Sequence, residues 1–91
     1  MITPDALRRL RNDVRIDRAL ALLEIPTKDQ EGYLRFLCPV CSEFNTAVNP
    51  RTNLGRCFRC QRNFNPIDLV LAETDCGFLE AVVRLRPLLR G

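Results

Sequence analysis

The apolar residues of the first third of the chain recur at helical spacing in two successive runs. Residues 3–5 (TPD) combine an N-cap hydroxyl, a proline suited to a first turn and an acid that suits the positive end of a helix dipole. These signals predict a helix to about Arg11. The apolar phase then shifts, which predicts a second helix from Asp13 to about Glu24, just before a proline. Residues 1–26 are therefore predicted to form an N-terminal helical segment.

The middle of the chain changes from helical spacing to short apolar runs broken by turn residues. The segment TKDQEG (27–32) is polar and predicts a turn. YLRFL (33–37) predicts a strand, and NTAVN (45–49) and NLGRCF (53–58) predict two more strands around the turn PRT. Residues 33–60 are thus predicted to form an antiparallel ribbon.

Helical spacing returns in the last third of the chain. Asn65 predicts an N-cap and Asp68 stands at the capping-box position, so a helix is predicted over residues 66–74. The sequence DCG interrupts the pattern, and a last helix is predicted from Phe78 until a proline ends it. Residues 65–86 are therefore predicted to form C-terminal helices.

Four of the five cysteines lie in two pairs within CPVCSEFNTAVNPRTNLGRCFRC, with two residues inside each pair and fifteen between the pairs. A Cys-x-x-Cys turn can direct both sulfurs at one ion, and a hairpin of this length brings two such turns together. The chain has no histidine, so a metal site must be all-sulfur or include a carboxylate. The spacing predicts one structural Zn²⁺ held by Cys38, Cys41, Cys57 and Cys60.

A metal would help to stabilise a chain of only 91 residues, because a domain of this size buries only about 60–65% of its unfolded surface. The predicted fold is α+β in a single domain over residues 1–91: a small zinc ribbon, made of an antiparallel hairpin or sheet with two Cys-x-x-Cys knuckles, flanked by N-terminal and C-terminal helices. No apolar run approaches the roughly 20 residues of a membrane span. The sequence does not open with the pattern of a signal peptide, so we expect a cytoplasmic protein.

The cysteines allow two other interpretations. Four free thiols would pack as small apolar side chains, and an iron site of the rubredoxin type would use the same four sulfurs. Ser42 and Gln61 follow the two pairs at positions where such iron knuckles favour glycine, which favours zinc. Cys76 lies outside the pairs, before Gly77, and is predicted to be a packed side chain, with a reactive thiol as the alternative.

Charge bears on function through its local distribution. The formal net charge is +3, and four thiolates with one divalent ion would lower it to +1. Between residues 38 and 66, four arginines stand against one acid, Glu43.

Alternation along YLRFL places Tyr33 and Arg35 on one face. Single-stranded nucleic acids are bound by cations and aromatic side chains on one surface. The candidate contacts are Tyr33, Arg35, Arg51, Arg56, Phe58 and Arg59.

Each of these candidates also has a purely structural interpretation. We expect Phe58 and Phe64 to be core aromatics, because so small a core needs its aromatic residues, and the arginines can simply face solvent. The competing class is a protein-docking module, which exposed apolar residues on the last helix, such as Leu79 and Val83, would favour. With no histidine, a closed metal site and no paired carboxylates, no catalytic residue is predicted.

Residues 14–85 resemble the N-terminal zinc-binding domain of bacterial DnaG-type DNA primases in the order and kind of their segments. A helix (VRIDRALALLEI) precedes a strand that leads to CP, and CFRC stands where the family has cysteine-phenylalanine-x-cysteine. NPIDLVLAE and FLEAVVRL are similar to the helical segments that follow in the family. The resemblance implies a module that contacts single-stranded template DNA in replication priming. Its implied partners are that template and a primase polymerase domain or helicase, with no membrane and no small-molecule substrate.

The chain departs from that family at three points. Cys41 stands where the family usually has a histidine ligand, so the predicted ligand set is four cysteines. QRNFN (61–65) replaces the family's glycine-rich link. The acidic cluster that the primase polymerase active site requires is not visible. The resemblance therefore implies a non-catalytic domain of a primase, not an enzyme by itself.

Overall fold

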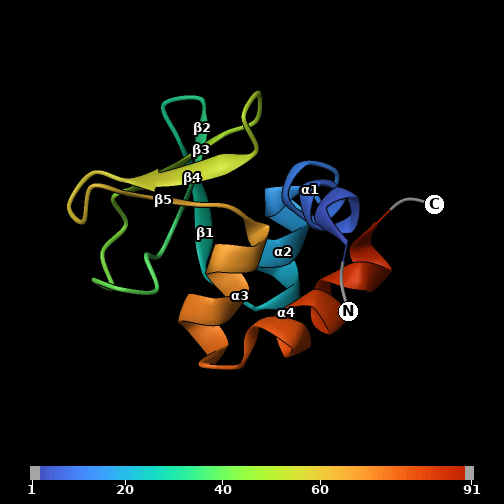
Figure 1. Ribbon diagram of the computed structural model, residues 1–91. Coiled ribbons are helices and arrows are strands. Elements are labelled where there is room, and N and C mark those ends of the chain that lie inside the picture. The colour runs from blue at the N-terminus through green and yellow to red at the C-terminus, as the bar shows by residue number, and fades with distance from the viewer. Residues whose placement is uncertain (1–2, 90–91) are drawn as a thin grey trace.

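Five antiparallel strands form one sheet, and four α-helices lie to one side of it, in the computed structural model, which describes residues 3–89 (Figure 1). The predicted α+β class is confirmed. Residues 1–2 and 90–91, the two ends of the predicted domain, lie outside the described part of the chain. None of the helices within residues 3–89 has the length and apolar character needed to cross a membrane.

Two short helices begin the described chain. α1 spans Pro4–Asn12, and the amide of Ala6 donates to the hydroxyl of Thr3 at 3.1 Å, which is the predicted cap. α2 spans Ile16–Leu22 and so begins later than its predicted start at Asp13. The residues between the two helices are bound to the sheet instead, as described below.

The strands follow one another across the sheet in chain order, each antiparallel to the next. They are β1 (Thr27–Gln30), β2 (Tyr33–Phe36), β3 (Thr46–Asn49), β4 (Leu54–Cys57) and β5 (Arg62–Phe64). The three central strands are those that the sequence predicts. Each strand therefore pairs with the next one along the chain, which is the simplest way to connect an antiparallel sheet.

The sequence prediction is wrong for both edge strands. Residues 27–32, predicted as a turn, form β1, and only Glu31 and Gly32 turn the chain, with φ values of 56° and 80°. β5 (62–64) is missing from the prediction altogether. β1 is polar throughout and β5 has only three residues, so neither sequence carries a strand pattern. Backbone pairing with a single neighbour holds them in the sheet.

Two further helical segments complete the described chain. α3 spans Pro66–Thr74 as predicted, and its capping box is present. Asn65 Oδ1 accepts from the amide of Asp68 at 2.8 Å, and Asp68 Oδ2 accepts from the amide of Asn65 at 3.2 Å. α4 spans Phe78–Leu85 and continues into a 3-10 turn, Arg86–Leu88, which contains the proline that was expected to end the helix. Proline is tolerated there because it lies in the first turn of the new segment.

Two apolar cores, joined by α3, hold the helices and the sheet together. The first lies between the sheet and the helices α2 and α3, and contains Ile16, Leu20, Ile25, Phe36, Cys38, Val48, Cys57, Phe64 and Leu69. The second lies among the helices, and contains Leu10, Val14, Ala19, Ile67, Val70, Ala81, Val82 and Leu85. Phe64 is thus a core aromatic, as predicted. Because α3 contributes to both cores, the packing of the sheet and of the helices is coupled.

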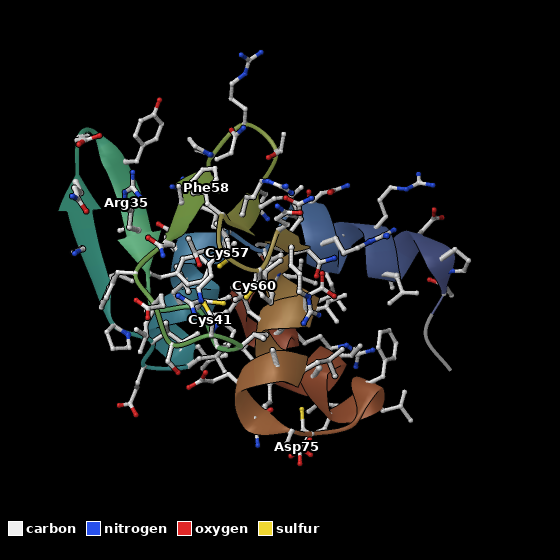
Figure 2. The ribbon with its side chains drawn as sticks, turned by 90° about the vertical axis from the view of Figure 1, so that its left-hand side faces the viewer. Arg35, Cys41, Cys57, Phe58, Cys60 and Asp75 are labelled. Atoms are coloured by element: carbon white, nitrogen blue, oxygen red, sulfur yellow. The ribbon has the colours of Figure 1, made fainter. Side chains whose placement is uncertain are left out.

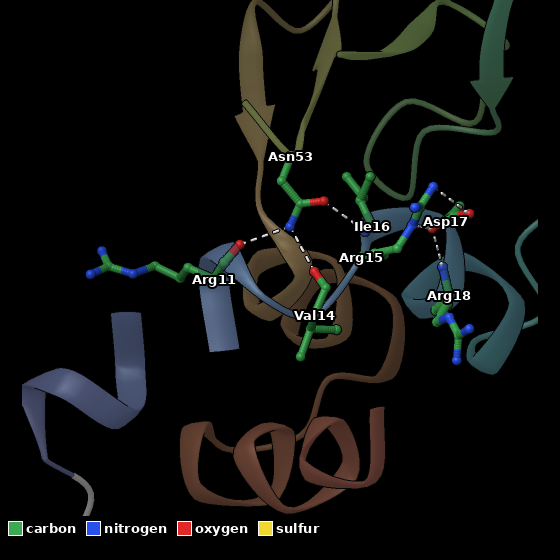
Figure 3. Close-up of polar contacts among 7 residues, drawn as sticks. All are labelled: Arg11, Val14, Arg15, Ile16, Asp17, Arg18 and Asn53. Atoms are coloured by element: carbon green, nitrogen blue, oxygen red, sulfur yellow. Dashed lines mark hydrogen bonds and ion pairs between the residues drawn. The ribbon is translucent and has the colours of Figure 1, made fainter. Parts of the chain in front are cut away.

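Asn53, in the turn between β3 and β4, fastens the link between α1 and α2 to the sheet (Figure 3). Its Nδ2 donates to the carbonyls of Arg11 (2.9 Å) and Val14 (2.6 Å), and its Oδ1 accepts from the amide of Ile16 (2.9 Å). Asn53 has a φ of 57°, in the left-handed region that asparagine tolerates better than most residues. One side chain therefore satisfies three backbone groups of the link.

Asn53→Ala is expected to lower the free energy of unfolding by about 2 kcal/mol, because it leaves backbone groups of the link without partners and places alanine in the left-handed region. Asn53→Gly separates the two causes, since glycine adopts that φ freely but lacks the amide. Denaturant unfolding of the metal-loaded protein, followed by circular dichroism, measures both variants. If Asn53→Gly were as stable as the unsubstituted chain, the three hydrogen bonds would contribute nothing to stability.

Candidate metal centre

The two cysteine pairs meet at one end of the sheet. Cys38 and Cys41 follow β2, Cys57 is the last residue of β4, and Cys60 lies in the turn before β5. β2 and β4 run in the same direction on either side of β3, so both strands finish at the same end of the sheet. The four Sγ atoms all lie within 4.8 Å of one another, and Figure 2 shows Cys41, Cys57 and Cys60 close together. The cluster can hold a metal ion.

The spacing of the sulfurs suits a single tetrahedral ion. Cys38 Sγ lies 3.9 Å from Cys60 Sγ, and Cys41 Sγ lies 3.7 Å from Cys57 Sγ. A tetrahedron with metal–sulfur bonds of about 2.3 Å has edges of roughly 3.8 Å. These separations are much longer than the roughly 2.05 Å of a disulfide, and the cysteines are free thiols. The geometry therefore matches four ligands of one ion.

A backbone amide donates to one sulfur in each pair. The N–H of Val40 donates to Cys38 Sγ, and the N–H of Cys60 donates to Cys57 Sγ, both at 3.4 Å. Such hydrogen bonds favour a thiolate over a thiol because they stabilise the charged form. Cys38 and Cys57 are also the buried members of the cluster, whereas Cys41 is partly exposed. Each turn thus favours the thiolate form of its buried cysteine, which is the form that binds a cation.

The residue after each pair turns the chain through the left-handed region. Ser42 has a φ of 60° and Gln61 a φ of 57°. Their amides donate back to the carbonyls of Cys38 and Cys57, at 2.9 and 2.8 Å. Glycine adopts this conformation most easily, yet a serine and a glutamine occupy it here. The two knuckles therefore share one backbone geometry although their side chains differ.

The pKa values of the thiols diverge across the cluster. Burial acts to raise the pKa of Cys57, but the amide of Cys60, the hydroxyl of Thr46 and the neighbouring thiols outweigh it and lower that pKa to about 6. Burial and the contacts with the other thiols raise the pKa of Cys60 to about 12, and burial also raises the pKa of Cys41. Further thiolates are thus unfavourable beside the first one. A divalent ion at the centre removes this conflict because it attracts all four thiolates.

Thr46 provides a test of whether the surroundings suit charged ligands. Its side chain is fully buried on β3, directly opposite Cys57 in the register. Apart from its approach to Cys57, the hydroxyl has no hydrogen-bond partner among the described residues. A buried hydroxyl without an acceptor costs about 1–3 kcal/mol, and a thiolate beside it would accept its proton. The residues present therefore fit a metal bound through thiolates.

The four sulfurs would close the shell of a bound ion. Four protein sulfurs complete a tetrahedral shell, so an ion held by them has no open position for water or substrate. Two of the ligands, Cys38 and Cys57, belong to the first apolar core. Cys76 lies outside the cluster and packs, partly buried, against the second core, as predicted. The cluster thus joins the two cysteine turns at this end of the sheet.

A row of residues at one register level crosses the sheet from edge to edge. Directly opposed residues on neighbouring strands point to the same side. The row consists of Lys28, Arg35, Ala47, Arg56 and Asn63. We call this row, together with Tyr33, the outer face, because its side chains are exposed or half-buried while residues of the opposite side fill the first core. Three of the predicted nucleic-acid contacts, Tyr33, Arg35 and Arg56, therefore share one surface.

Lys28 was not among the predicted contacts. It lies on β1 directly opposite Arg35, and its Nζ is 4.7 Å from the centroid of the Phe44 ring. The prediction of a turn over residues 27–32 hid this position, since alternation has meaning only within a strand. Lys28 could have been predicted as a contact only if residues 27–30 had been recognised as a strand that pairs with YLRFL.

The other predicted contacts lie elsewhere. Phe58 belongs to the second knuckle and is 60% exposed, so its prediction as a core aromatic is wrong. The reason is that Phe36 and Phe64 already fill the core on this side of the sheet. Arg59 Nη1 lies 3.9 Å from Glu43 Oε1, which partly balances its charge. Arg51 lies in the β3–β4 turn, at the opposite end of the strands from the cysteines.

Comparison of the chain with protein-family models finds no match, and comparison with curated proteins finds no significant match. The class of protein is therefore defined by the fold and the site. The chain forms a small α+β domain whose five-stranded antiparallel sheet carries a cluster of four cysteines, consistent with a zinc ribbon.

Proposed function

We propose that this chain is a zinc-stabilised module that binds single-stranded DNA through its outer face, and that it contacts template DNA in replication priming as the resemblance to primase zinc domains implies. The observation that carries the proposal is the row of three cations, Lys28, Arg35 and Arg56, with no acid among them. The proposal gives the module no catalytic step of its own.

Ala47 leaves space between two of these cations. It lies between Arg35 and Arg56 in the register. Because strands are about 4.8 Å apart, the two arginines flank a low floor roughly 10 Å wide. A phosphate or base edge over Ala47 would meet a guanidinium on either side. Arg35 Nε is buried without a hydrogen-bond partner among the described residues, and Arg56 Nη1 donates to Asn63 Oδ1 at 3.4 Å. Because Arg35 Nε is itself buried, a phosphate would contact the terminal nitrogens of the Arg35 guanidinium, whereas Asn63 orients the guanidinium of Arg56.

Two exposed aromatic rings accompany this floor. Tyr33 on β2 and Phe58 beyond the end of β4 are each more than half exposed. Figure 2 shows Arg35 and Phe58 on the same side of the cysteine cluster. In so small a domain aromatic rings usually contribute to the core, so their exposure favours a ligand that stacks on them. A stacked base contributes about 1–3 kcal/mol, whatever its identity.

Zinc is the ion that we propose for the cysteine cluster. A closed, tetrahedral, all-sulfur site suits Zn²⁺, which has no redox chemistry and no preference for another geometry. Iron of the rubredoxin type would use the same shell. The closed shell suits either ion, so the support for zinc comes from Ser42 and Gln61, which stand where iron knuckles favour glycine. Metal analysis decides between the two ions.

The double variant Arg35→Ala/Arg56→Ala is expected to bind single-stranded DNA about tenfold more weakly at low salt. Each lost phosphate contact lowers the slope of log K against log salt concentration by about 0.7 for a single strand, so losing both contacts lowers it by about 1.4. Fluorescence anisotropy of a labelled oligothymidylate, titrated at several salt concentrations, measures affinity and slope together.

Arg8→Ala is the matched control, because it removes the same charge from an exposed position on α1, away from the sheet. Because the double variant loses two charges, its full control is Arg8→Ala/Arg84→Ala, which also removes an arginine from α4 and so has the same net charge. Metal content and melting temperature should stay unchanged in every variant. Equal DNA affinity and slope in the double variant and its control would remove the outer face as the binding site.

A second candidate function is docking on a protein partner. Leu79 and Val83 lie one turn apart on α4 and are 67% and 64% exposed, which is the observation that favours it. Docking and DNA binding are separated by the amide spectra of the metal-loaded protein during titration with single-stranded DNA. Shifts centred on the outer face support DNA binding. If no residue moves even at low salt, DNA binding is wrong and docking becomes the better assignment.

A further inference from the structure

A cleft of about 520 Å³ lies at the opposite end of the strands from the cysteine cluster. Its walls come from segments far apart in the sequence: the link between α1 and α2, the β1–β2 turn and the β3–β4 turn. The volume falls within the roughly 300–1,000 Å³ of small-molecule sites. No sequence motif marks this cleft, and the sequence predicts no small-molecule ligand.

The cleft combines an apolar floor with cationic side chains. Ile16, Leu34 and Val48 line it and also belong to, or pack against, the first core. Arg15 and Arg51 line it from two different walls, and both are exposed. The site therefore suits a ligand with a flat apolar part joined to an anion.

The one acid in the cleft does not cancel both cations. Asp17 Oδ1 accepts from Arg15 Nε at 3.2 Å and from the amide of Arg18 at 3.0 Å (Figure 3). Arg51, in contrast, forms no ion pair with any residue of the described part of the chain. The guanidinium of Arg51 is thus available to an anion, and the lining side chains keep a net positive charge.

Asn53 makes the cleft a pre-formed site. Both N–H groups and the oxygen of its amide are already used in hydrogen bonds to the link between α1 and α2. Asn53 is therefore a wall and not a ligand contact. Because those bonds hold two of the three walls together, a ligand would not have to order them on binding.

We infer that the cleft binds a nucleotide, with the base on the apolar floor and the phosphate against Arg51 and the remaining donors of Arg15. Tyr33 lines the cleft and also belongs to the outer face, so the two surfaces are continuous. The nucleotide is either a unit of a bound strand or a free nucleoside triphosphate, which share this chemistry. The inference goes beyond the proposed function, because a free nucleotide needs no contact with the outer face.

Titration of the metal-loaded, isotope-labelled chain with ATP at low salt tests the inference by NMR. ATP is expected to shift the amide signals of residues 15–17, 32–34 and 50–53. Adenosine and inorganic triphosphate should each bind more weakly, since each supplies only half of the ligand. Arg51→Glu is expected to weaken ATP binding about tenfold or more. Arg8→Glu, an equal charge reversal on α1, should leave it unchanged.

A short oligothymidylate identifies the source of the nucleotide. If a unit of the strand occupies the cleft, the oligonucleotide shifts the cleft signals and displaces ATP. If a free nucleotide is the ligand, the oligonucleotide and ATP bind together. Both results support a nucleotide site.

The inference is overturned if neither ATP nor the oligonucleotide shifts any cleft signal, or if the shifts are undiminished in Arg51→Glu. Oligonucleotide shifts confined to the outer face, together with no ATP shifts in the cleft, would remove this inference and leave the proposed function standing. ATP shifts in the cleft without any oligonucleotide binding would do the reverse.

Discussion

Removal of the metal ion that we propose for the cysteine cluster is expected to unfold the sheet and to abolish most of the stability of the chain. Structural zinc contributes about 10–16 kcal/mol in small zinc domains, whereas a whole domain is stable by only about 5–15 kcal/mol. Two of the four ligands, Cys38 and Cys57, are core residues here, so loss of the ion opens the first core as well as the knuckles. Because α3 is shared by both cores, the helices lose packing with the sheet.

Circular dichroism melting curves and amide spectra, recorded before and after a strong chelator is added, measure this effect. The chelated protein should lose its cooperative transition and the dispersion of its sheet signals, and one equivalent of Zn²⁺ should restore both. Metal analysis of the purified protein is expected to give one zinc per chain and no colour. A reddish protein with one iron per chain would overturn the zinc assignment.

Two cysteine variants form a matched pair for this prediction. Cys57→Ala removes a buried ligand and should behave like the chelated protein. Cys76→Ala removes a partly buried thiol outside the cluster, so it should bind metal normally and lose no more than about 1 kcal/mol. A chelated protein that melts within a few degrees of the loaded one would show that the metal is not structural.

The cysteine cluster was accessible from the sequence because its geometry is local. Each pair sits in one tight turn, and the hairpin between the turns is short enough to bring them together. The cap of α3 was accessible for the same reason, since Asn65 and Asp68 are three residues apart. In both cases the separation of the residues along the sequence is enough to predict that they interact.

Features that depend on distant residues could not be predicted in this way. Asn53 bonds backbone groups 37 to 42 positions away, so nothing near it in the sequence indicates its role. Lys28 joins the outer face only because β1 pairs with β2, although the sequence of β1 is polar throughout. The cleft likewise depends on three segments that meet only in the folded chain.

Gly55 on β4 is another residue whose role depends on such a contact. It is buried, and its φ lies outside the positive range, so its backbone conformation does not require glycine. A Cβ at this position would lie 2.6 Å from both Cε1 and Cζ of Phe36 and 3.4 Å from Cγ2 of Thr46. Phe36 is itself fully buried beside Cys38 in the first core. Glycine is therefore needed because the Phe36 ring lies directly against the β4 backbone.

Gly55→Ala is expected to lower the free energy of unfolding by about 3 kcal/mol and the melting temperature by roughly 10–20 °C. The sign is informative, because alanine in place of glycine within a strand otherwise stabilises by about 0.5–1 kcal/mol. Thermal and denaturant unfolding of the zinc-loaded protein measure the change. Gly77→Ala is the matched control, since nothing lies within 4 Å of its added Cβ, and we expect it to change stability by less than about 1 kcal/mol.

Phe36→Leu identifies the cause, because leucine lacks the ring atoms that the new methyl group would meet. Alone it should cost about 1–2 kcal/mol for the cavity that it leaves. Combined with Gly55→Ala it should cost less than the sum of the two single changes, by about 1 kcal/mol or more. Phe36 lies two residues before Cys38, so a displaced ring also disturbs the first knuckle. Zinc affinity should therefore fall in Gly55→Ala and recover in the double variant, whereas strictly additive losses would place the cause away from the Phe36 ring.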